Sequence, residues 1–220
     1  MKGRRRILVA STNPGKLREL REMLGGEIEW VGLGDFPSVI EIEEDGKTFA
    51  ENARKKATGY AKATGLWTLA DDSGLVIDAL GGQPGVKSAR FARAKDKDRN
   101  IIDRKNFEKV LRLLKDVPKE KRQARFVCCL CLASPEKVLI ETEGKLEGII
   151  INEPAGENGF GYDPIFFVPE LNKTVAQLAA EEKNAISHRG QAIRILKPQL
   201  EGLLKGRRRA GDGQTKQIMV

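Results

Sequence analysis

Short apolar runs separated by polar turn residues predict the strands of this chain. They lie at residues 7–10, 67–70, 125–133, 138–142 and 146–151. Each run has the length of a buried or half-buried strand, and the last three follow one another at hairpin spacing. The second half of the chain is therefore predicted to extend the sheet or to form a second lobe.

Longer stretches with apolar residues at helical spacing predict the helices. One begins at a capping box formed by Thr48 and Glu51, and others cover residues 103–117 and 174–182. Ser187 is predicted to cap the last helix of the chain.

The start of the first helix is a candidate phosphate site. Asn13 suits its N-cap and Pro14 its first position, whereas Glu19 belongs to a polar side that is predicted to face water. Free N–H groups and the helix dipole favour an anion at such a helix start. Lys16 opposes the dipole, and a bound polyphosphate would account for its position. The segment is not a Walker A loop, because no Ser or Thr follows this lysine.

Two adjacent carboxylates follow the apolar run at residues 67–70, in the sequence Asp71-Asp72-Ser73-Gly74. The pattern predicts a loop at the end of a buried strand, where the two acidic groups repel each other unless a cation or a proton shares the site. Carboxylate oxygens are the ligands that Mg²⁺ prefers. A solvated turn is the alternative, because Asp, Ser and Gly are common turn residues.

A second acidic run, Glu41, Glu43, Glu44 and Asp45, precedes the helix that begins at Thr48. Acidic residues often precede helices because they interact favourably with the dipole. This run is therefore a weak indication of a metal site when it is taken alone.

Size and composition fit one large domain, or two lobes that share a core. The chain has 220 residues, of which 40% are hydrophobic and 32% charged. No apolar run approaches the roughly 20 residues of a membrane helix, and none near the N-terminus suits a signal peptide. Cys128, Cys129 and Cys131 lie in an apolar strand rather than at the spacing of a zinc site or a disulfide framework. A cytoplasmic, reducing location is expected.

The net charge of +8 is concentrated at the two ends. Four basic residues lie within residues 1–6 and four within residues 205–209, and without them 31 basic residues balance 31 acidic ones. We predict a basic extension at 1–6, one two-lobed domain at 7–204 and a poorly ordered basic tail at 205–220. The ends could bind nucleic acid with strong salt dependence, but solvated tails are the favoured interpretation.

Five short segments form a pattern when they are taken in chain order. They are Ser11-Thr12-Asn13-Pro14-Gly15-Lys16, Thr48-Phe49-Ala50-Glu51-Asn52-Ala53, Ala70-Asp71-Asp72-Ser73-Gly74-Leu75, Gly159-Phe160-Gly161-Tyr162-Asp163-Pro164 and Ser187-His188-Arg189-Gly190. In that order they resemble the inosine/xanthosine triphosphate pyrophosphatases, enzymes that remove non-standard purine nucleotides. Each segment is weak alone, whereas the set spans about residues 7–200 and is specific.

The resemblance implies an α/β fold with a long mixed central sheet flanked by helices, and two lobes with a cleft between them. It also implies a homodimer. The activity implied is Mg²⁺-dependent hydrolysis of dITP, ITP, XTP and dXTP to the monophosphate and pyrophosphate.

The family pattern places Glu43 and Asp72 at the metal, with Asp72 as the proton acceptor. Asp71 would help to hold the ion or would raise its neighbour's proton affinity. Ser73 matches a substrate-contacting position. The segment Ser11-Thr12-Asn13-Pro14-Gly15-Lys16 resembles a triphosphate cradle, although many members have glycine where this chain has threonine.

The resemblance also implies a base pocket at Phe160-Gly161-Tyr162-Asp163. The aromatic ring of Phe160 would stack on the purine, and Asp163 would contact the opposite part of the base or support the other polar residues. The residues that would meet the 6-keto oxygen are Lys183, His188 and Arg189. Lysine and arginine are donors only, so such a pocket favours a keto group over the amino group of adenine.

Each of these residues also has a plain structural interpretation. His188 could be a helix-start residue, Phe160 a loop anchor, and Lys183 and Arg189 part of a solvated face. The alternative enzyme is a related pyrophosphatase that acts on modified pyrimidines or standard nucleotides. The alternative of another class is a non-catalytic nucleic-acid-binding protein that uses its basic ends.

Overall fold

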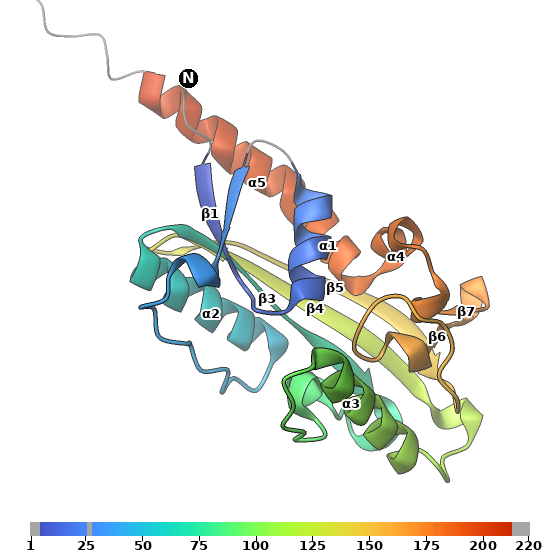
Figure 1. Cartoon of the computed structure of the whole chain (residues 1–220). Helices are drawn as coiled ribbons and strands as arrows, with labels where there is room; N and C mark the ends of the chain where they lie inside the picture. Colours follow the sequence, from blue (N-terminus) through green and yellow to red (C-terminus); the bar gives the residue numbers. More distant parts are fainter. Residues whose placement is uncertain (1–4, 26–27, 213–220) are drawn as a thin grey trace, which may run out of the picture.

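The computed structural model describes residues 5–25 and 28–212, which form a seven-stranded mixed sheet (Figure 1). The strand order is β2-β1-β3-β4-β5-β6-β7, with β1 parallel to β2 and β3 and the other neighbours antiparallel. The strands are β1 (Arg5–Ala10), β2 (Ile28–Gly32), β3 (Trp67–Ile77), β4 (Gln123–Ala133), β5 (Val138–Ile150), β6 (Phe166–Val168) and β7 (Lys173–Thr174). The expected α/β class with a mixed central sheet is confirmed.

Helices cover both faces of this sheet. They are α1 (Pro14–Leu24), α2 (Phe49–Thr64), α3 (Arg99–Leu113), α4 (Ala180–Ile186) and α5 (His188–Asp212). Helices α1 and α5 pack together on one face, and α2 packs on the other (Figure 1). Both arrangements bury the apolar sides that the helical spacing predicts.

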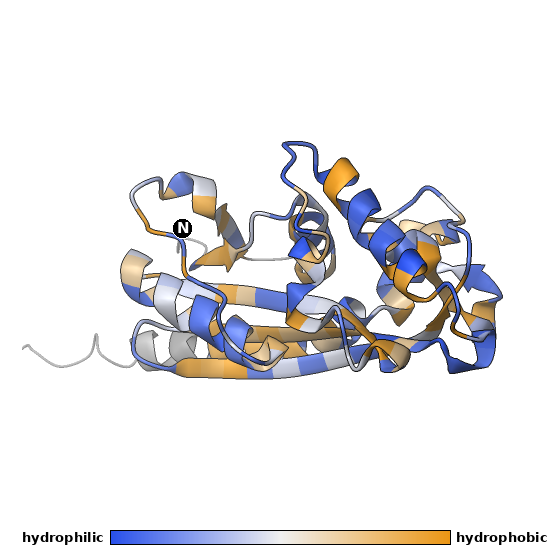
Figure 2. Ribbon diagram, turned by 90° about the horizontal axis from the view of Figure 1, so that it is seen from below, coloured by the Kyte–Doolittle hydropathy of each residue, from blue (hydrophilic) through white to orange (hydrophobic). Residues whose placement is uncertain are grey.

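The long strands β3, β4 and β5 carry two lobes. The start of β3, the end of β4 and the start of β5 lie between α1, α5 and α2. The other ends of these strands pack with α3, β6 and the residues around Tyr162 in a separate hydrophobic cluster. Figure 2 shows largely hydrophobic central strands and largely hydrophilic peripheral loops. Both lobes therefore share one continuous sheet.

Two strands continue where the sequence predicts an interruption. Strand β3 runs through Asp71-Asp72-Ser73-Gly74 to Ile77, so the predicted loop at this position is wrong. Strand β5 joins the two predicted strands at 138–142 and 146–151 through Gly144. A Cβ atom at Gly144 would lie 2.1 Å from the carbonyl oxygen of His188. This glycine permits close contact with α5 rather than a turn.

Helix boundaries in the second half also differ from the prediction. Helix α3 begins at Arg99, after an N-cap at Asp98 whose side chain accepts the N–H of Asn100 at 2.9 Å. The segment predicted as one helix at 174–182 contains a 3₁₀ turn, Val175–Gln177, followed by α4. The predicted cap at Ser187 is confirmed, because its hydroxyl accepts the N–H of Gly190 at 3.0 Å.

The two predicted basic ends fall partly outside the described residues. Residues 1–4 and 213–220 are not described, whereas Arg5 and Arg6 begin β1 and α5 continues to Asp212. The division of the chain into 1–6, 7–204 and 205–220 stays a prediction. Within the described ranges, no helix is both long enough and apolar enough to cross a membrane.

The close contact at Gly144 gives a testable prediction. Gly144→Ala would press a methyl group against the backbone of α5 at His188 and Ala192, so we expect the free energy of unfolding to fall by about 1–3 kcal/mol. Gly202→Ala, which lies in α5 itself and has open space around its Cβ position, is the control and should raise the free energy of unfolding by up to about 1 kcal/mol. Chemical denaturation measures both, and an unchanged stability of the Gly144 variant would contradict the contact.

Candidate active site

The candidate site lies where β1 ends and β3 continues. The two strands pair from Ile7–Trp67 to Ala10–Ala70, so none of the strands in the described residues lies beside β3 beyond Ala70 on the β1 side. Helix α1 follows β1 and packs on one face of the sheet. Helix α2 precedes β3 and packs on the other face. Crevices at such points, next to the carboxyl ends of strands, are where open α/β sheets bind ligands. A pocket lined by residues of both lobes opens here.

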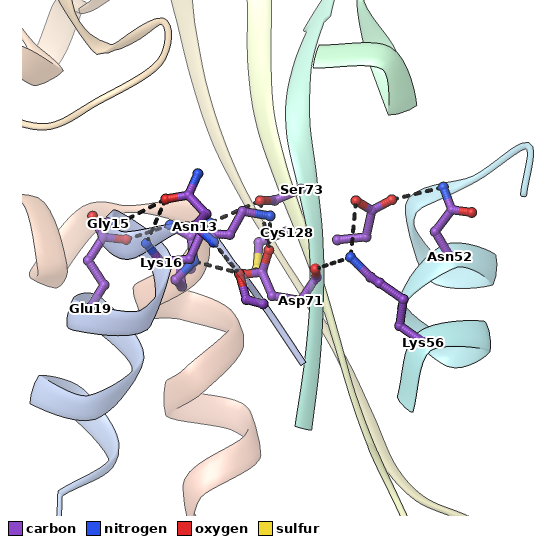
Figure 3. A network of polar contacts seen from close by, with 12 residues as sticks. Asn13, Gly15, Lys16, Glu19, Asn52, Lys56, Asp71, Ser73 and Cys128 are labelled. Atoms are coloured by element: carbon purple, nitrogen blue, oxygen red, sulfur yellow. Dashed lines mark hydrogen bonds and ion pairs between the residues drawn. The ribbon is translucent and has the colours of Figure 1, made fainter. Parts of the chain in front are cut away.

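The start of α1 forms one wall of this pocket. The Asn13 side chain accepts the backbone N–H groups of Gly15 at 2.9 Å and Lys16 at 3.2 Å. The helix-start N–H groups that the sequence led us to expect free are therefore capped by the protein itself. The Lys16 ammonium donates to the Asp71 carboxylate (Figure 3). This ion pair explains a lysine that opposes the helix dipole, even without a bound anion.

Asp71 is a buried acceptor on the α1 and α5 side of the sheet. Its carboxylate accepts hydrogen bonds from Lys16 and from the Ser73 hydroxyl at 2.9 Å (Figure 3). It also accepts one from Arg189 Nε at 2.8 Å. The Cys128 thiol donates to it at 3.3 Å. Burial raises the pKa of Asp71, but Arg189 and Lys16 outweigh burial and hold the pKa well below its usual value. Asp71 is therefore anionic and has no free oxygen facing a metal.

Asp72 points to the opposite face, toward α2. Asn52 donates to its Oδ2 at 3.0 Å, and the Lys56 ammonium lies 3.9 Å from its Oδ1. Burial raises the pKa of Asp72 to about 6, with Lys56 opposing and Glu44 reinforcing the shift. Successive side chains of a strand alternate between faces. Because Asp71 and Asp72 lie on a strand and not in a loop, their carboxylates have different surroundings on opposite faces of the sheet.

The acidic run before α2 contributes Glu44 to the pocket and not Glu43. Glu43 is exposed and does not line the pocket, whereas Glu44 Oε1 lies 2.7 Å from the Lys56 ammonium. The expected pair of metal ligands, Glu43 and Asp72, is therefore not brought together here. No cluster of three or more His, Cys, Asp or Glu side chains suited to a metal occurs in the part of the chain that the structure describes.

The donor set of Asp72 and Glu44 nevertheless fits a magnesium ion that substrate phosphates help to bind. Mg²⁺ is commonly held by one or two carboxylates together with phosphate oxygens and water. The raised pKa of Asp72 shows a carboxylate whose charge is not fully balanced by Lys56. A cation between these two side chains would restore the balance.

The other end of the pocket contains three cations and three carboxylates in alternation. Arg189 bridges Asp71 and Glu19, and Lys183 contacts Glu19 at 2.8 Å and Asp163 at 2.6 Å. The order is Lys16, Asp71, Arg189, Glu19, Lys183, Asp163. Glu19 is only 4% exposed, so the prediction that it faces water is wrong. The two cations that contact Glu19 are Lys183 of α4 and Arg189 of α5.

Phe160 forms an aromatic wall beside these cations. The Lys183 ammonium lies 4.5 Å from the centre of its ring, and a Cβ at Gly15 would lie 2.5 Å from that ring. Asp163 accepts the Phe160 N–H at 2.9 Å and the Lys183 ammonium. Of the two roles left open for Asp163, the structure favours support of the neighbouring polar residues. Asp103 of α3 accepts the Gly161 N–H at 2.9 Å and steadies the same loop.

His188 is buried in the pocket wall. Its ring stacks on Phe126, with centroids 4.9 Å apart, and burial lowers its pKa well below its usual value. Its Nδ1 has no hydrogen-bond partner among the described residues. A neutral imidazole with one unsatisfied buried nitrogen is suited to a polar atom of a ligand.

Most of the predicted residues meet in this one pocket, and five further polar residues line it or contact the side chains that do. Those that line it are Ser11, Thr12, Asn13, Lys16, Asp72, Ser73, Phe160, Gly161, Tyr162, Asp163, Lys183, His188 and Arg189. Pro14, Gly15 and Glu43 do not. The residues that sequence reasoning missed are Glu19, Glu44, Asn52, Lys56 and Asp103. Asn52 and Lys56 carried a usable signal, because they lie four residues apart on the apolar side of α2.

Comparison with known proteins places this arrangement in a family. A sequence model of the Ham1 family matches residues 7–199. The chain belongs to the Ham1 family. A dITP/XTP pyrophosphatase of Geobacter sulfurreducens is 50% identical over 196 residues, which cover 89% of this chain and 96% of the relative. One of Bacillus cereus is 47% identical over 203 residues, 91% of this chain and 97% of the relative.

Solved Ham1 structures share the fold. A HAM1 protein from Coxiella burnetii matches with a TM-score of 0.80 and 45% identity, over 90% of this chain and 99% of that one. A nucleoside-triphosphatase, or dITP/XTP pyrophosphatase, from Mycobacterium abscessus matches with a TM-score of 0.71 and 46% identity, over 88% and 99%. The Ham1 likeness therefore covers the sheet, both lobes and the pocket between them.

The two adjacent aspartates should affect stability with opposite signs. The pKa of Asp72 is raised from 3.8 to about 6, so the unfolded state releases this proton first and stability falls as pH rises through that window. Asp72→Asn should raise the free energy of unfolding by about 1–3 kcal/mol at about pH 8, and this gain should shrink below about pH 5.

Asp71→Asn is the matched variant and should lower the free energy of unfolding by about 3–5 kcal/mol at about pH 8, because it leaves buried cations without their partner. The depressed pKa of Asp71 means that this loss diminishes as pH falls. Denaturation in metal-free buffer measures both changes. A change of the same sign in the two variants would contradict the assignment of the aspartates to opposite faces with opposite charge balance.

Proposed function

We propose that this chain hydrolyses deaminated purine nucleoside triphosphates, dITP, ITP, XTP and dXTP, to the monophosphate and pyrophosphate, with Mg²⁺. The observation that carries the proposal is the pocket itself. It places a carboxylate with a raised pKa, Asp72, between a lysine-lined end and an aromatic wall flanked by donors. The relatives named dITP/XTP pyrophosphatase support the same reaction.

The phosphates would bind at the α1 end of the pocket. Ser11, Thr12 and Asn13 line it next to the Lys16 ammonium, and Lys56 adds a second cation from α2. These two lysines approach β3 from opposite faces, so the triphosphate would lie across the edge of the strand beyond the end of β1. Such preorganised positive charge stabilises the charge that develops on the phosphates during the reaction.

Asp72 is the proposed general base for the attacking water. A base is most effective when its pKa lies near the working pH, and the pKa of Asp72 is raised to about 6. Asn52 occupies Oδ2, which leaves Oδ1 to accept the proton. Lys56 fixes the strand by donating to the Asp71 carbonyl at 2.7 Å. It thereby holds the neighbouring carboxylate at a defined height in the pocket.

Asp72 and Glu44 are the proposed ligands of Mg²⁺, in place of the pair that the sequence pattern implied. The ion would neutralise phosphate charge and lower the pKa of the attacking water. Glu44 would then exchange its contact with Lys56 for one with the ion, which frees this lysine for phosphate.

The purine base of the nucleotide would stack on Phe160 and present its 6-keto oxygen to the hydrogen-bond donors around it. Lys183 and Arg189 are held by Glu19 and Asp163 and can only donate. The unsatisfied Nδ1 of His188 can take a further polar contact. The amino group of adenine would face donors in this pocket, and unpaired buried polar groups exclude a near-isostere strongly. This arrangement favours hypoxanthine and xanthine over adenine.

Two further expectations belong to the same proposal. A cytoplasmic location agrees with three buried cysteines that form no disulfide. The homodimer implied by the resemblance stays a prediction, which the molar mass in solution tests.

Product analysis tests the reaction. With ITP and Mg²⁺ we expect IMP and pyrophosphate rather than IDP and phosphate, because Asp72 would direct water to the α-phosphorus. Asp72→Asn should lower kcat by about 10²–10⁴-fold while the circular dichroism spectrum stays that of the wild type. Asp45→Asn, an exposed acidic residue paired with Lys55, is the control and should keep full turnover. Near-normal turnover of the Asp72 variant would refute its role.

A panel of nucleotides tests the base pocket. The ratio of kcat/KM for dITP to that for dATP should be at least about 100, and Lys183→Met should reduce this ratio mainly by lowering kcat/KM for dITP. Pyrophosphate release measures both. Equal turnover of dATP and dITP by the wild type would remove the proposed specificity and favour an enzyme for standard nucleotides.

A further inference from the structure

Asp71 occupies an unusual place between the two halves of the pocket. Its side chain is fully buried beside Lys16 (Figure 3) and also contacts Arg189. Oδ1 accepts from Lys16 and Ser73, and Oδ2 accepts from Arg189 and Cys128. Each oxygen therefore holds one of the two cations. The cations belong to different helices, α1 and α5, and carry like charge, so a shared anion between them is what keeps them close.

The carboxylate is itself held rigidly. The Asp71 backbone pairs with Leu130 of β4, and its carbonyl oxygen accepts the Lys56 ammonium at 2.7 Å. The Ser73 hydroxyl is a second bridge, because it donates to Asp71 and accepts from Arg189 at 2.9 Å. Neither cation can shift without changing the contacts of the other.

We propose that Asp71 is a positioning residue that couples base recognition to phosphate binding, by fixing Lys16 and Arg189 to one carboxylate. The inference rests on the proposed function, in which Lys16 meets the phosphates and Arg189 the base. A nucleotide whose base engages Arg189 then finds Lys16 already placed for its phosphates. A nucleotide that displaces Arg189 also disturbs Lys16.

The test is a double-mutant cycle on ITP binding. Calorimetry in EDTA measures the dissociation constant of ITP without turnover, for the wild type, Lys16→Gln, Arg189→Gln and the double variant. In each single variant every carboxylate keeps one cation, since Lys16 or Arg189 remains for Asp71 and Lys183 remains for Glu19. Circular dichroism and thermal melting check that each variant is folded.

Each single variant changes the dissociation constant of ITP by some factor. We expect the factor for the double variant to differ from the product of the two single factors by about fivefold or more. In the Asp71→Asn background, the factor for the double change should equal that product to within about threefold. The control pair is Lys56→Gln with Arg189→Gln. Lys56 contacts Asp71 through its backbone carbonyl and not through its carboxylate, so the effects of this pair on the dissociation constant should also multiply to within about threefold in the wild-type background.

Three results would overturn the proposal. They are simple multiplication of the Lys16 and Arg189 effects, equal coupling in the control pair, and coupling that persists in Asp71→Asn. If Asp71→Asn does not fold, the first two comparisons decide. Release of pyrophosphate from ITP by the wild type is measured separately. If ITP binds with the expected coupling but no pyrophosphate is released, the proposed reaction is refuted and the positioning role of Asp71 is still supported.

Discussion

The candidate site depends on one constraint: side chains alternate between the two faces of β3, and this strand continues past the end of its neighbour β1. Strand β3 continues past the end of β1, and its Asp71 and Asp72 point to opposite faces of the sheet. Because no strand of the described part of the chain covers this edge, residues from both faces reach the same pocket. Two carboxylates that are adjacent in sequence therefore lie in different environments.

The two environments give the aspartates opposite electrostatic character. Asp71 lies among Lys16, Arg189 and donors that favour its charge, and its pKa is held well below the usual value. Asp72 has one hydrogen bond from Asn52 and a cation at 3.9 Å, and burial raises its pKa to about 6. An anion that organises cations and a carboxylate poised to exchange a proton are distinct functions. Only a continuous strand keeps them this close and yet separate.

The helices hold this arrangement in place through ion pairs rather than through apolar contacts alone. Helix α1 contributes Lys16 and Glu19, which are one turn apart, and these contact Asp71 on β3 and both Lys183 and Arg189 on α4 and α5. Gly144 lets α5 approach β5 closely enough for this contact. Because Arg189 and Lys183 are each shared between two carboxylates and Asp71 also binds Lys16, the base side and the phosphate side of the pocket form one connected network.

The sequence by itself determined most strands and helices and the N-caps at Asn13, Thr48 and Ser187, because these follow from local spacing and side-chain chemistry. The α/β class and the grouping of four of the five segments in one pocket were implied by the resemblance to a family. Tertiary structure alone decided that β3 continues through Asp71 and Asp72, that Glu44 rather than Glu43 turns inward, and that Glu19 is buried. Each of these depends on a partner distant in sequence: β4 extends the strand, Lys56 draws in Glu44, and Arg189 balances the charge of Glu19.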